Sequence, residues 1–177
     1  MKARAAWAAF TAVALLAAAG VATAAGLAPA YQAMVVEPAG LPARAEFDLT
    51  AAVQRARKEK RRLYVYLGAN DCPYCRKYEA FLEKNAQELV PHFAPYLVVD
   101  LRSSLSVQAN ALFIKVGSSS LPYAEFQRSI GDERARLLVY PSVWLLDGNV
   151  KPLMQMPAGT GTFQTVPEQL EILRLEQ

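Results

Sequence analysis

The sequence predicts an α/β domain in which buried strands alternate with helices, and three observations support this fold class. An apolar run from Leu63 to Leu67 is rich in aromatic and β-branched residues, which is typical of a strand buried on both faces. An amphipathic pattern with helical spacing follows it directly. A later apolar run contains Pro141 and ends in Asp147-Gly148, which predicts a strand followed by a hairpin turn.

The length and composition favour a single well-packed domain. The chain has 177 residues, of which 53% are hydrophobic and 20% charged, enough for one core and short of what two domains usually need.

The first 25 residues are typical of a secretory signal peptide. Lys2 and Arg4 precede an apolar run, and Ala22-Thr23-Ala24 supplies a small-residue cleavage site. The alternative is an uncleaved membrane anchor, although the apolar run is short and alanine-rich for crossing a bilayer. No cysteine near the cleavage site could carry a lipid.

Removal of that segment leaves 17 basic and 16 acidic residues, a formal net charge of +1, so nucleic acid is not an expected partner. The one dense basic run lies between Arg55 and Arg62. It is interpreted as a solvated helix end, since cations are favoured near a helix C-terminus. A docking patch for an acidic partner or a lipid surface is the alternative.

Residues 26–45 are predicted to be an extended arm or linker, because Pro29, Pro38, Gly40 and Pro42 interrupt any regular pattern there. Residues 46–177 are assigned to the globular domain. Its first element is a predicted helix with an apolar face from Phe47 to Ala56, for which Asp48 or Thr50 is a candidate cap.

Both cysteines, Cys72 and Cys75, lie where the first buried strand ends and the next helix begins. Pro73 suits the first turn of a helix, where a missing N–H costs nothing. The apolar or aromatic residues Tyr78, Phe81 and Leu82 define the buried face, and Arg76, Lys77 and Glu79 fall between them.

This placement predicts thiol chemistry. Free N–H groups and the helix dipole at an N-terminus stabilise negative charge, and the thiolate is the reactive form of cysteine. We therefore expect Cys72 to be an acidified, exposed nucleophile. Cys75, one turn deeper, is placed to attack a mixed disulfide between Cys72 and a partner, which closes an intramolecular disulfide and releases the partner reduced.

Two other interpretations of the cysteine pair are half of a zinc site and a structural disulfide. A zinc site needs two more ligands, but the chain has no third cysteine and a single histidine, His92, for which a surface position is expected. A disulfide that closes so short a loop would restrict the unfolded chain little. No metal and no cofactor is expected.

The remainder of the chain supplies further elements. Residues 96–101 are a second predicted buried strand, and a helix is expected to begin at Pro167. Between the strands, residues 102–136 form an excursion for which we expect short helices over 107–116 and 123–130 and loops around 103–106 and 117–120.

Taken in order, these elements resemble the thioredoxin superfamily from about Phe47 to the C-terminus: a strand, CPYC at a helix start, a strand, an excursion, a proline-led strand, a hairpin and a helix. The resemblance implies a thioredoxin fold, with a central mixed β-sheet flanked by helices. It also implies that Pro141 is cis and lies beside the cysteines, and that Pro73, Tyr74, Tyr140 and Pro141 contact the substrate.

The chain also departs from cytoplasmic-type thioredoxins. Asp71 replaces the tryptophan before the first cysteine and should oppose thiolate formation at Cys72. Tyr66 stands where those proteins carry a buried carboxylate, so proton transfer from Cys75 needs water or another group. The dipeptide Pro73-Tyr74 between the cysteines resembles that of glutaredoxins, which share CPYC. Thr165-Val166-Pro167 is similar to the glutaredoxin cis-proline motif, but no strand hairpin follows it, and glutathione use is therefore unsupported.

Together, the signal peptide and the resemblance imply a thiol–disulfide oxidoreductase in the periplasm or another extracytoplasmic space, where disulfides persist. Its expected partners are exported thiol or disulfide proteins and a membrane electron donor or acceptor. Reduction is slightly favoured over oxidation by analogy with the family. The alternative is a thioredoxin-like docking or redox-sensing module without turnover.

Overall fold

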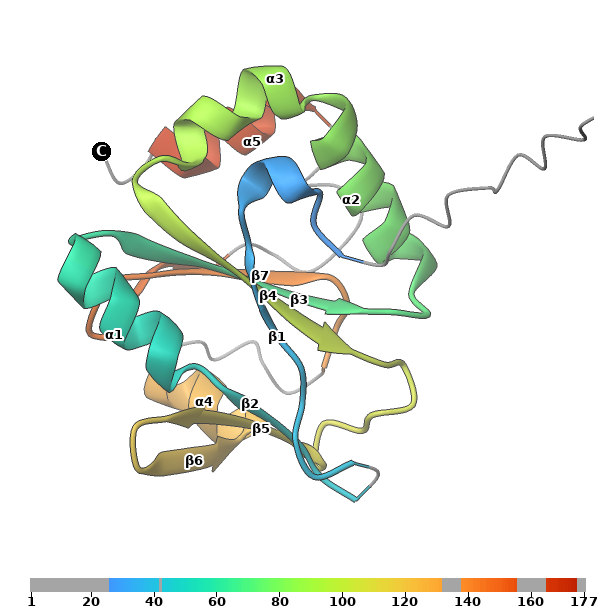
Figure 1. Ribbon diagram of the computed structural model, residues 1–177. Coiled ribbons are helices and arrows are strands. Elements are labelled where there is room, and N and C mark those ends of the chain that lie inside the picture. The colour runs from blue at the N-terminus through green and yellow to red at the C-terminus, as the bar shows by residue number, and fades with distance from the viewer. Residues whose placement is uncertain (1–25, 42, 132–137, 156–164, 175–177) are drawn as a thin grey trace, which may run out of the picture.

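The computed structural model describes residues 26–41, 43–131, 138–155 and 165–174, and the predicted signal peptide lies outside them. Its central feature is a mixed five-stranded sheet with the order β1-β4-β3-β7-β8 (Figure 1). The strands of this sheet are β1 (Met34–Val36), β3 (Arg62–Ala69), β4 (Tyr96–Ser103), β7 (Ser142–Leu146) and β8 (Pro152–Gln155). β1, β4 and β3 are parallel, whereas β7 and β8 are antiparallel.

Helices cover both faces of this sheet (Figure 1). The helices are α1 (Thr50–Glu59), α2 (Pro73–Lys84), α3 (Ala86–Leu89), α4 (Tyr123–Ser129) and α5 (Val166–Arg174), with 3-10 turns η1 (Pro29–Tyr31) and η2 (Val90–Phe93). Side chains of β3 alternate between the two faces. Leu63, Val65 and Leu67 pack with α1 and α4 in one core, while Tyr64 and Tyr66 pack with α2 and α5 in the other.

The connection β3-α2-β4 followed by β7-β8-α5 is the arrangement of the thioredoxin fold, so the predicted fold class is confirmed. The predicted strands at 63–67 and 96–101 and the helix near Pro167 are all present. The Asp147 carboxylate accepts the N–H groups of Asn149 (2.7 Å) and Lys151 (2.8 Å) and thereby closes the turn between β7 and β8.

The excursion differs from its prediction. A helix is present at α4, as expected for 123–130, but the helix expected over 107–116 is wrong. Residues Leu112–Val116 form β5, which pairs with β6 (Ser119–Pro122) and with β2 (Ala45–Asp48) in a second sheet. Leu112 and Ile114 are buried, and this alternation is that of a strand with one buried face. The strand forms because β2, which is distant in sequence, pairs with it.

The start of the domain also differs. Phe47 lies in β2 rather than on a helix, and α1 begins only at Thr50, whose N–H is accepted by Asp48 at 2.9 Å. Parts of the segment 26–45, for which an arm or linker was expected, pack against the rest of the chain. Leu27 and Tyr31 are buried, and β1 adds a parallel strand to β4.

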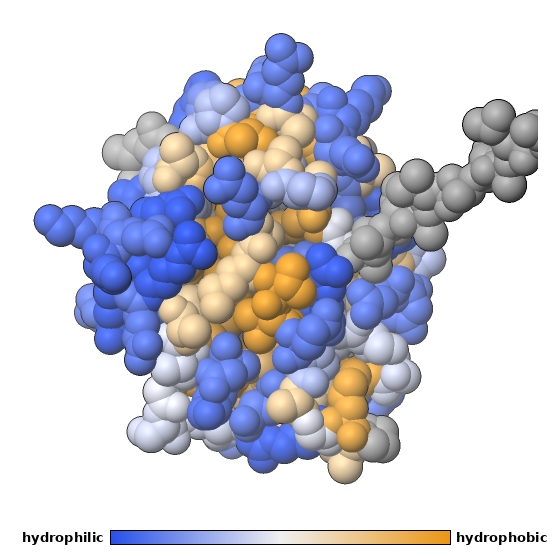
Figure 2. Space-filling view, in the orientation of Figure 1, coloured by the Kyte–Doolittle hydropathy of each residue, from blue (hydrophilic) through white to orange (hydrophobic). Residues whose placement is uncertain are grey.

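The sheet edge formed by β1 carries hydrophobic surface. In Figure 2, orange, which marks hydrophobic residues, runs down the centre of the visible face, over the region where Figure 1 draws β1. Val35 on this strand is 45% exposed. Within the described residues, no helix is both long enough and apolar enough to cross a membrane.

Candidate active site

The two cysteines lie at the junction between β3 and α2, as predicted. Cys72 is the N-cap residue of α2, and its Sγ accepts the N–H of Cys75 at 3.1 Å. Pro73 is the first residue of the helix. The first N–H groups of a helix have no partner within the helix, and the dipole favours negative charge at this end. The Cys72 sulfur therefore occupies the N-cap position and accepts one of these free N–H groups.

Burial of the cysteines contradicts one expectation. Cys72 is 2% exposed and Cys75 is fully buried, both as free thiols, so the prediction of an exposed nucleophile is wrong for this conformation. Cys72 and Cys75 form a buried cluster with Ala69, and Tyr140 from the loop before β7 packs against this cluster. A local strand-to-helix pattern contains no information about a side chain that arrives from nearly seventy residues further along the chain.

Cys75 lies in an environment that keeps its thiol protonated. Burial raises the pKa of Cys75 to about 12, and the neighbouring Cys72 side chain acts in the same direction. The Ala69 N–H, which donates to Cys75 Sγ at 3.5 Å, opposes this rise only in part. Cys75 is therefore neutral at physiological pH and needs a proton acceptor before it can attack a disulfide.

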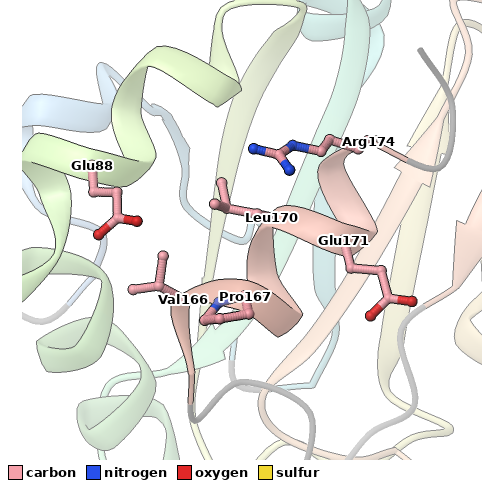
Figure 3. Close-up of a pocket in the computed structure, with 6 residues that line it drawn as sticks. All are labelled: Glu88, Val166, Pro167, Leu170, Glu171 and Arg174. Atoms are coloured by element: carbon pink, nitrogen blue, oxygen red, sulfur yellow. The ribbon is translucent and has the colours of Figure 1, made fainter.

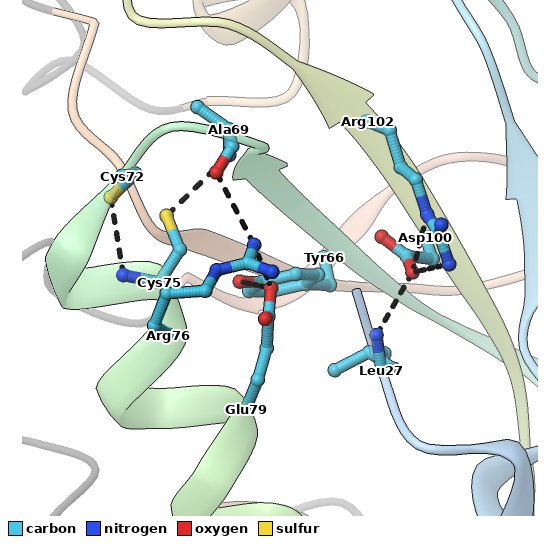
Figure 4. Close-up of polar contacts among 9 residues, drawn as sticks. All are labelled: Leu27, Tyr66, Ala69, Cys72, Cys75, Arg76, Glu79, Asp100 and Arg102. Atoms are coloured by element: carbon cyan, nitrogen blue, oxygen red, sulfur yellow. Dashed lines mark hydrogen bonds and ion pairs between the residues drawn. The ribbon is translucent and has the colours of Figure 1, made fainter. Parts of the chain in front are cut away.

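A buried polar network lies directly beneath Cys75 (Figure 4). The Tyr66 hydroxyl donates to Glu79 Oε1 at 2.8 Å, and the same oxygen accepts from Arg76 Nη2 at 2.8 Å. Arg76 Nη2 also donates to the Ala69 carbonyl at 3.3 Å. Glu79 is 7% exposed, although the sequence pattern assigned it to the polar side of the helix.

Sequence reasoning thus missed Glu79 as a site residue, and a signal for it was available. Glu79 follows Cys75 by four residues on α2, and residues four apart share one face of a helix. A carboxylate at that position is brought under the second cysteine by the helix geometry alone. Burial raises the pKa of Glu79 above its usual range, while the Tyr66 hydroxyl and Arg76 oppose the rise.

A second buried carboxylate, Asp100 on β4, lies next to this network. Its Oδ2 accepts the N–H of Leu27 at 3.0 Å and pairs with Arg102 at 3.1 Å, while its Oδ1 has no partner within the described residues. Burial raises the pKa of Asp100. Its position on the neighbouring strand adds negative charge near Glu79 and so helps to raise the pKa of that carboxyl.

Asp71, immediately before Cys72, is held in its charged form by the loop after β4. Its carboxylate accepts the Leu105 N–H at 2.8 Å and the Ser104 hydroxyl at 3.2 Å. These hydrogen bonds, the Leu105 amide first, lower the pKa of Asp71. The residue immediately before Cys72 in the sequence therefore carries a fixed negative charge.

The predicted substrate-binding residues fall into two groups. Tyr140 lies beside the cysteines, and its Oη is hydrogen-bonded to Ser103 Oγ at 2.7 Å. The peptide bond between Tyr140 and Pro141 is cis, as the resemblance implied. Tyr74, by contrast, points to solvent with 52% of its surface exposed, and Lys77 Nζ lies 5.5 Å from its ring centre. Pro73 is also exposed.

Grooves on the described surface include one that is remote from the cysteines and one that is near them. A groove of about 520 Å³ runs between α3 and α5 and is lined by Glu88, Val166, Pro167, Leu170, Glu171 and Arg174 (Figure 3). None of these residues belongs to the cysteine site. A smaller groove of about 280 Å³ includes Asn70, Ser103 and Ser104 in its lining, and these residues adjoin Asp71 and Tyr140.

His92 lies in η2 and is partly buried, away from the cysteine network. Among the described residues, no group of three or more histidine, cysteine, aspartate or glutamate side chains is arranged to hold a metal ion.

Comparison with known proteins adds little beyond the topology. No protein-family model matches the sequence, and no curated protein matches it. Among solved structures, the chain is similar to the exposed lipoprotein thioredoxin Etrx1 from Streptococcus pneumoniae strain TIGR4, with 16% identity and a TM-score of 0.34 over 64% of this chain and 84% of that chain. The protein has a thioredoxin-like fold, with the free cysteines Cys72 and Cys75 at the start of α2.

Proposed function

We propose that this protein is an extracytoplasmic thiol–disulfide oxidoreductase that exchanges disulfides with exported proteins. The observation that carries the proposal is the position of Cys72 as the N-cap of α2, with its sulfur accepting the Cys75 N–H at 3.1 Å and with Cys75 one helical turn deeper. The extracytoplasmic location rests on the signal-like pattern of residues 1–25.

In the reductive direction, the Cys72 thiolate attacks a disulfide of the partner protein, forming a mixed disulfide and releasing one partner thiolate. Cys75, after loss of its proton, attacks Cys72 Sγ. The new Cys72–Cys75 bond forms as the bond to the partner breaks, and the second partner sulfur leaves as a thiolate that takes up a proton. A membrane electron donor then returns the pair to the dithiol state.

Access to Cys72, which is 2% exposed, requires a neighbouring side chain to move, and Tyr140 packs against the cluster that contains it. The groove that is lined in part by Asn70, Ser103 and Ser104 is next to Tyr140, whose hydroxyl is hydrogen-bonded to Ser103. We propose that an extended partner segment binds across Tyr140 and Pro141 and displaces the Tyr140 ring, while exposed Pro73 and Tyr74 contact the partner from the helix side.

The test is the equilibrium reduction potential of the cysteine pair in the purified chain without residues 1–25, titrated against glutathione or dithiothreitol and followed by thiol alkylation. A value near that of thioredoxin, roughly −270 mV, supports a reductant fed by a membrane donor. A value near −120 mV supports an oxidant. If the two cysteines form no reversible disulfide, the proposed activity is wrong.

The low exposure of Cys72, 2%, favours one competing function, a docking or redox-sensing module without turnover. The Cys72→Ser variant separates the two. An oxidoreductase loses disulfide exchange with a model substrate in this variant, whereas a docking module has no exchange activity to lose and retains its partner.

A further inference from the structure

In the resolving step, Cys75 has to transfer its proton to another group before it attacks the mixed disulfide. Cys75 is fully buried, and the strand position from which a carboxylate could serve it holds Tyr66. We infer that Glu79 accepts the proton of Cys75 through the hydroxyl of Tyr66, so that the helix supplies the base and the strand supplies a relay. This inference rests on the proposed function and assigns a proton acceptor to the same site.

The geometry connects the groups in sequence. Tyr66 Oη donates to Glu79 Oε1 at 2.8 Å, and the Tyr66 and Cys75 side chains lie close enough for each to affect the pKa of the other. Figure 4 shows the Tyr66 ring and the Glu79 carboxylate beside each other below Cys75. A hydroxyl can accept one proton while it donates another. Tyr66 therefore passes a proton on without becoming charged.

This property matters because Tyr66 itself is a poor acid. Burial is the main cause that raises the pKa of Tyr66 above its ordinary value, and the charge of Glu79 contributes. A stepwise mechanism through a tyrosinate is therefore unfavourable. The concerted shift of two protons, from Cys75 Sγ to Tyr66 Oη and from Tyr66 Oη to Glu79 Oε1, needs no tyrosinate.

The surroundings of Glu79 shift its pKa upward from the ordinary carboxyl value. It faces Tyr66 from β3, Arg76 from its own helix, the main chain of Gly26 and, from β4, Asp100, which is paired with Arg102. Burial and Asp100 raise the pKa of Glu79, and Tyr66, Arg76 and Gly26 lower it. A general base is most effective when its pKa lies close to the working pH.

The step balances as follows. The Cys75 proton ends on Glu79, the electron pair of Cys75 Sγ forms the bond to Cys72 Sγ, and the bond between Cys72 and the partner sulfur breaks. The partner leaves as a thiolate. In the reverse direction, protonated Glu79 returns the proton to Cys75 as the disulfide opens.

The experiment uses the reduced chain without residues 1–25 and the aryl disulfide dithiobis-nitrobenzoate as the probe. Attack by Cys72 releases one thionitrobenzoate, and attack by Cys75 on the resulting mixed disulfide releases a second, so the two steps are separate phases of one absorbance trace. The variants are Glu79→Gln and Tyr66→Phe. The matched control is Tyr64→Phe, which removes another buried hydroxyl of β3 that is bonded to Tyr78 instead.

We expect the second phase to slow by roughly 10²-fold at neutral pH in both variants, the usual contribution of a general base, while the first phase and the Tyr64→Phe control keep their rates. The pH dependence of the second-phase rate distinguishes a proton acceptor from a residue with a merely structural role. The wild-type rate levels off once Glu79 is ionised, whereas the Glu79→Gln rate keeps rising with hydroxide concentration, so the ratio between the two shrinks as pH increases.

The inference is overturned if the second phase of Tyr66→Phe is as fast as wild type, or if Tyr64→Phe slows it equally. If the Glu79→Gln variant does not fold, Tyr66→Phe still tests the inference, because this substitution keeps the ring and removes no charge. Failure of the proposed function has a different signature: the wild-type chain then shows no second phase and forms no intramolecular disulfide.

Discussion

Replacement of Gly68 by alanine tests whether Tyr66 is held in place by close packing. Gly68 follows Tyr66 by two residues on the same face of β3. A Cβ atom at this position would lie 2.7 Å from Tyr66 Cε1 and 2.8 Å from Tyr66 Cζ and Oη. These separations are shorter than van der Waals contact, so the phenol has to move. Tyr66 is fully buried and packs against Tyr78, with ring centroids 5.7 Å apart, which limits where it can go.

The expected free energy change follows from three contributions. Overpacking a buried site costs about 1–3 kcal/mol, and loss of the bond from Tyr66 to Glu79 costs about 0.5–1.5 kcal/mol. Reduced entropy of the unfolded chain returns about 0.4–1 kcal/mol, because the backbone at Gly68 is one that alanine can adopt. We therefore expect Gly68→Ala to lower the free energy of unfolding by about 2 kcal/mol.

The assay is urea unfolding of the chain without residues 1–25, with the cysteines reduced, in which the midpoint should fall while the slope stays constant. The control is the same substitution in a Tyr66→Leu background, where no ring remains to be displaced. There Gly68→Ala should cost less than about 0.5 kcal/mol, which gives a coupling of about 2 kcal/mol between the two sites. A Gly68→Ala protein as stable as wild type would refute the reasoning.

Three further predictions concern the surroundings of the site. Gly26→Ala should destabilise the chain, because Gly26 has φ +121° and a Cβ there would lie 2.6 Å from Asp100 Oδ2 and closer still to Arg102 Nη2; thermal unfolding measures the loss. Asp100→Asn should make stability less dependent on pH: burial raises the folded-state pKa of Asp100 above 3.8, so the native state binds the proton more tightly and stability falls as pH rises above that value. Urea unfolding at a series of pH values measures this slope. Tyr140→Ala should accelerate alkylation of Cys72 severalfold, since Tyr140 packs against the cluster that contains Cys72, which is 2% exposed; mass spectrometry after timed exposure to iodoacetamide measures the rate.

Each of these three predictions has an outcome that contradicts it. An unfolding temperature for Gly26→Ala equal to that of wild type would show that the N-terminal segment does not pack closely at Asp100. Equal pH slopes for Asp100→Asn and wild type would mean that this carboxyl is not perturbed by burial. A Cys72 alkylation rate that stays the same in Tyr140→Ala would mean that another group covers the sulfur.

The sequence predicted those parts of the site that depend on neighbours in the chain. The apolar run of β3, the proline in the first turn of α2 and the Asp147-Gly148 turn each have a local physical cause, namely burial on both faces, fixed φ and a side chain that accepts nearby N–H groups. These features were enough to place Cys72 and Cys75 at a helix start. The cis peptide bond before Pro141 and the absence of a carboxylate at Tyr66 were implied by the resemblance to the thioredoxin superfamily and not by these local features.

Tertiary structure alone decided the rest, because it depends on which distant residues meet. Burial of Glu79 results from β3 placing Tyr66 under α2, and cover of Cys72 results from the loop before β7 bringing Tyr140 to it. The strand at Leu112–Val116 likewise exists because β2 lies beside it, as β-pairing draws on partners far away in the chain. The sequence by itself determined the position and type of the reactive groups. Their exposure, their proton acceptor and their cover were decided by packing, since solvent access and buried hydrogen bonds are properties of the assembled core.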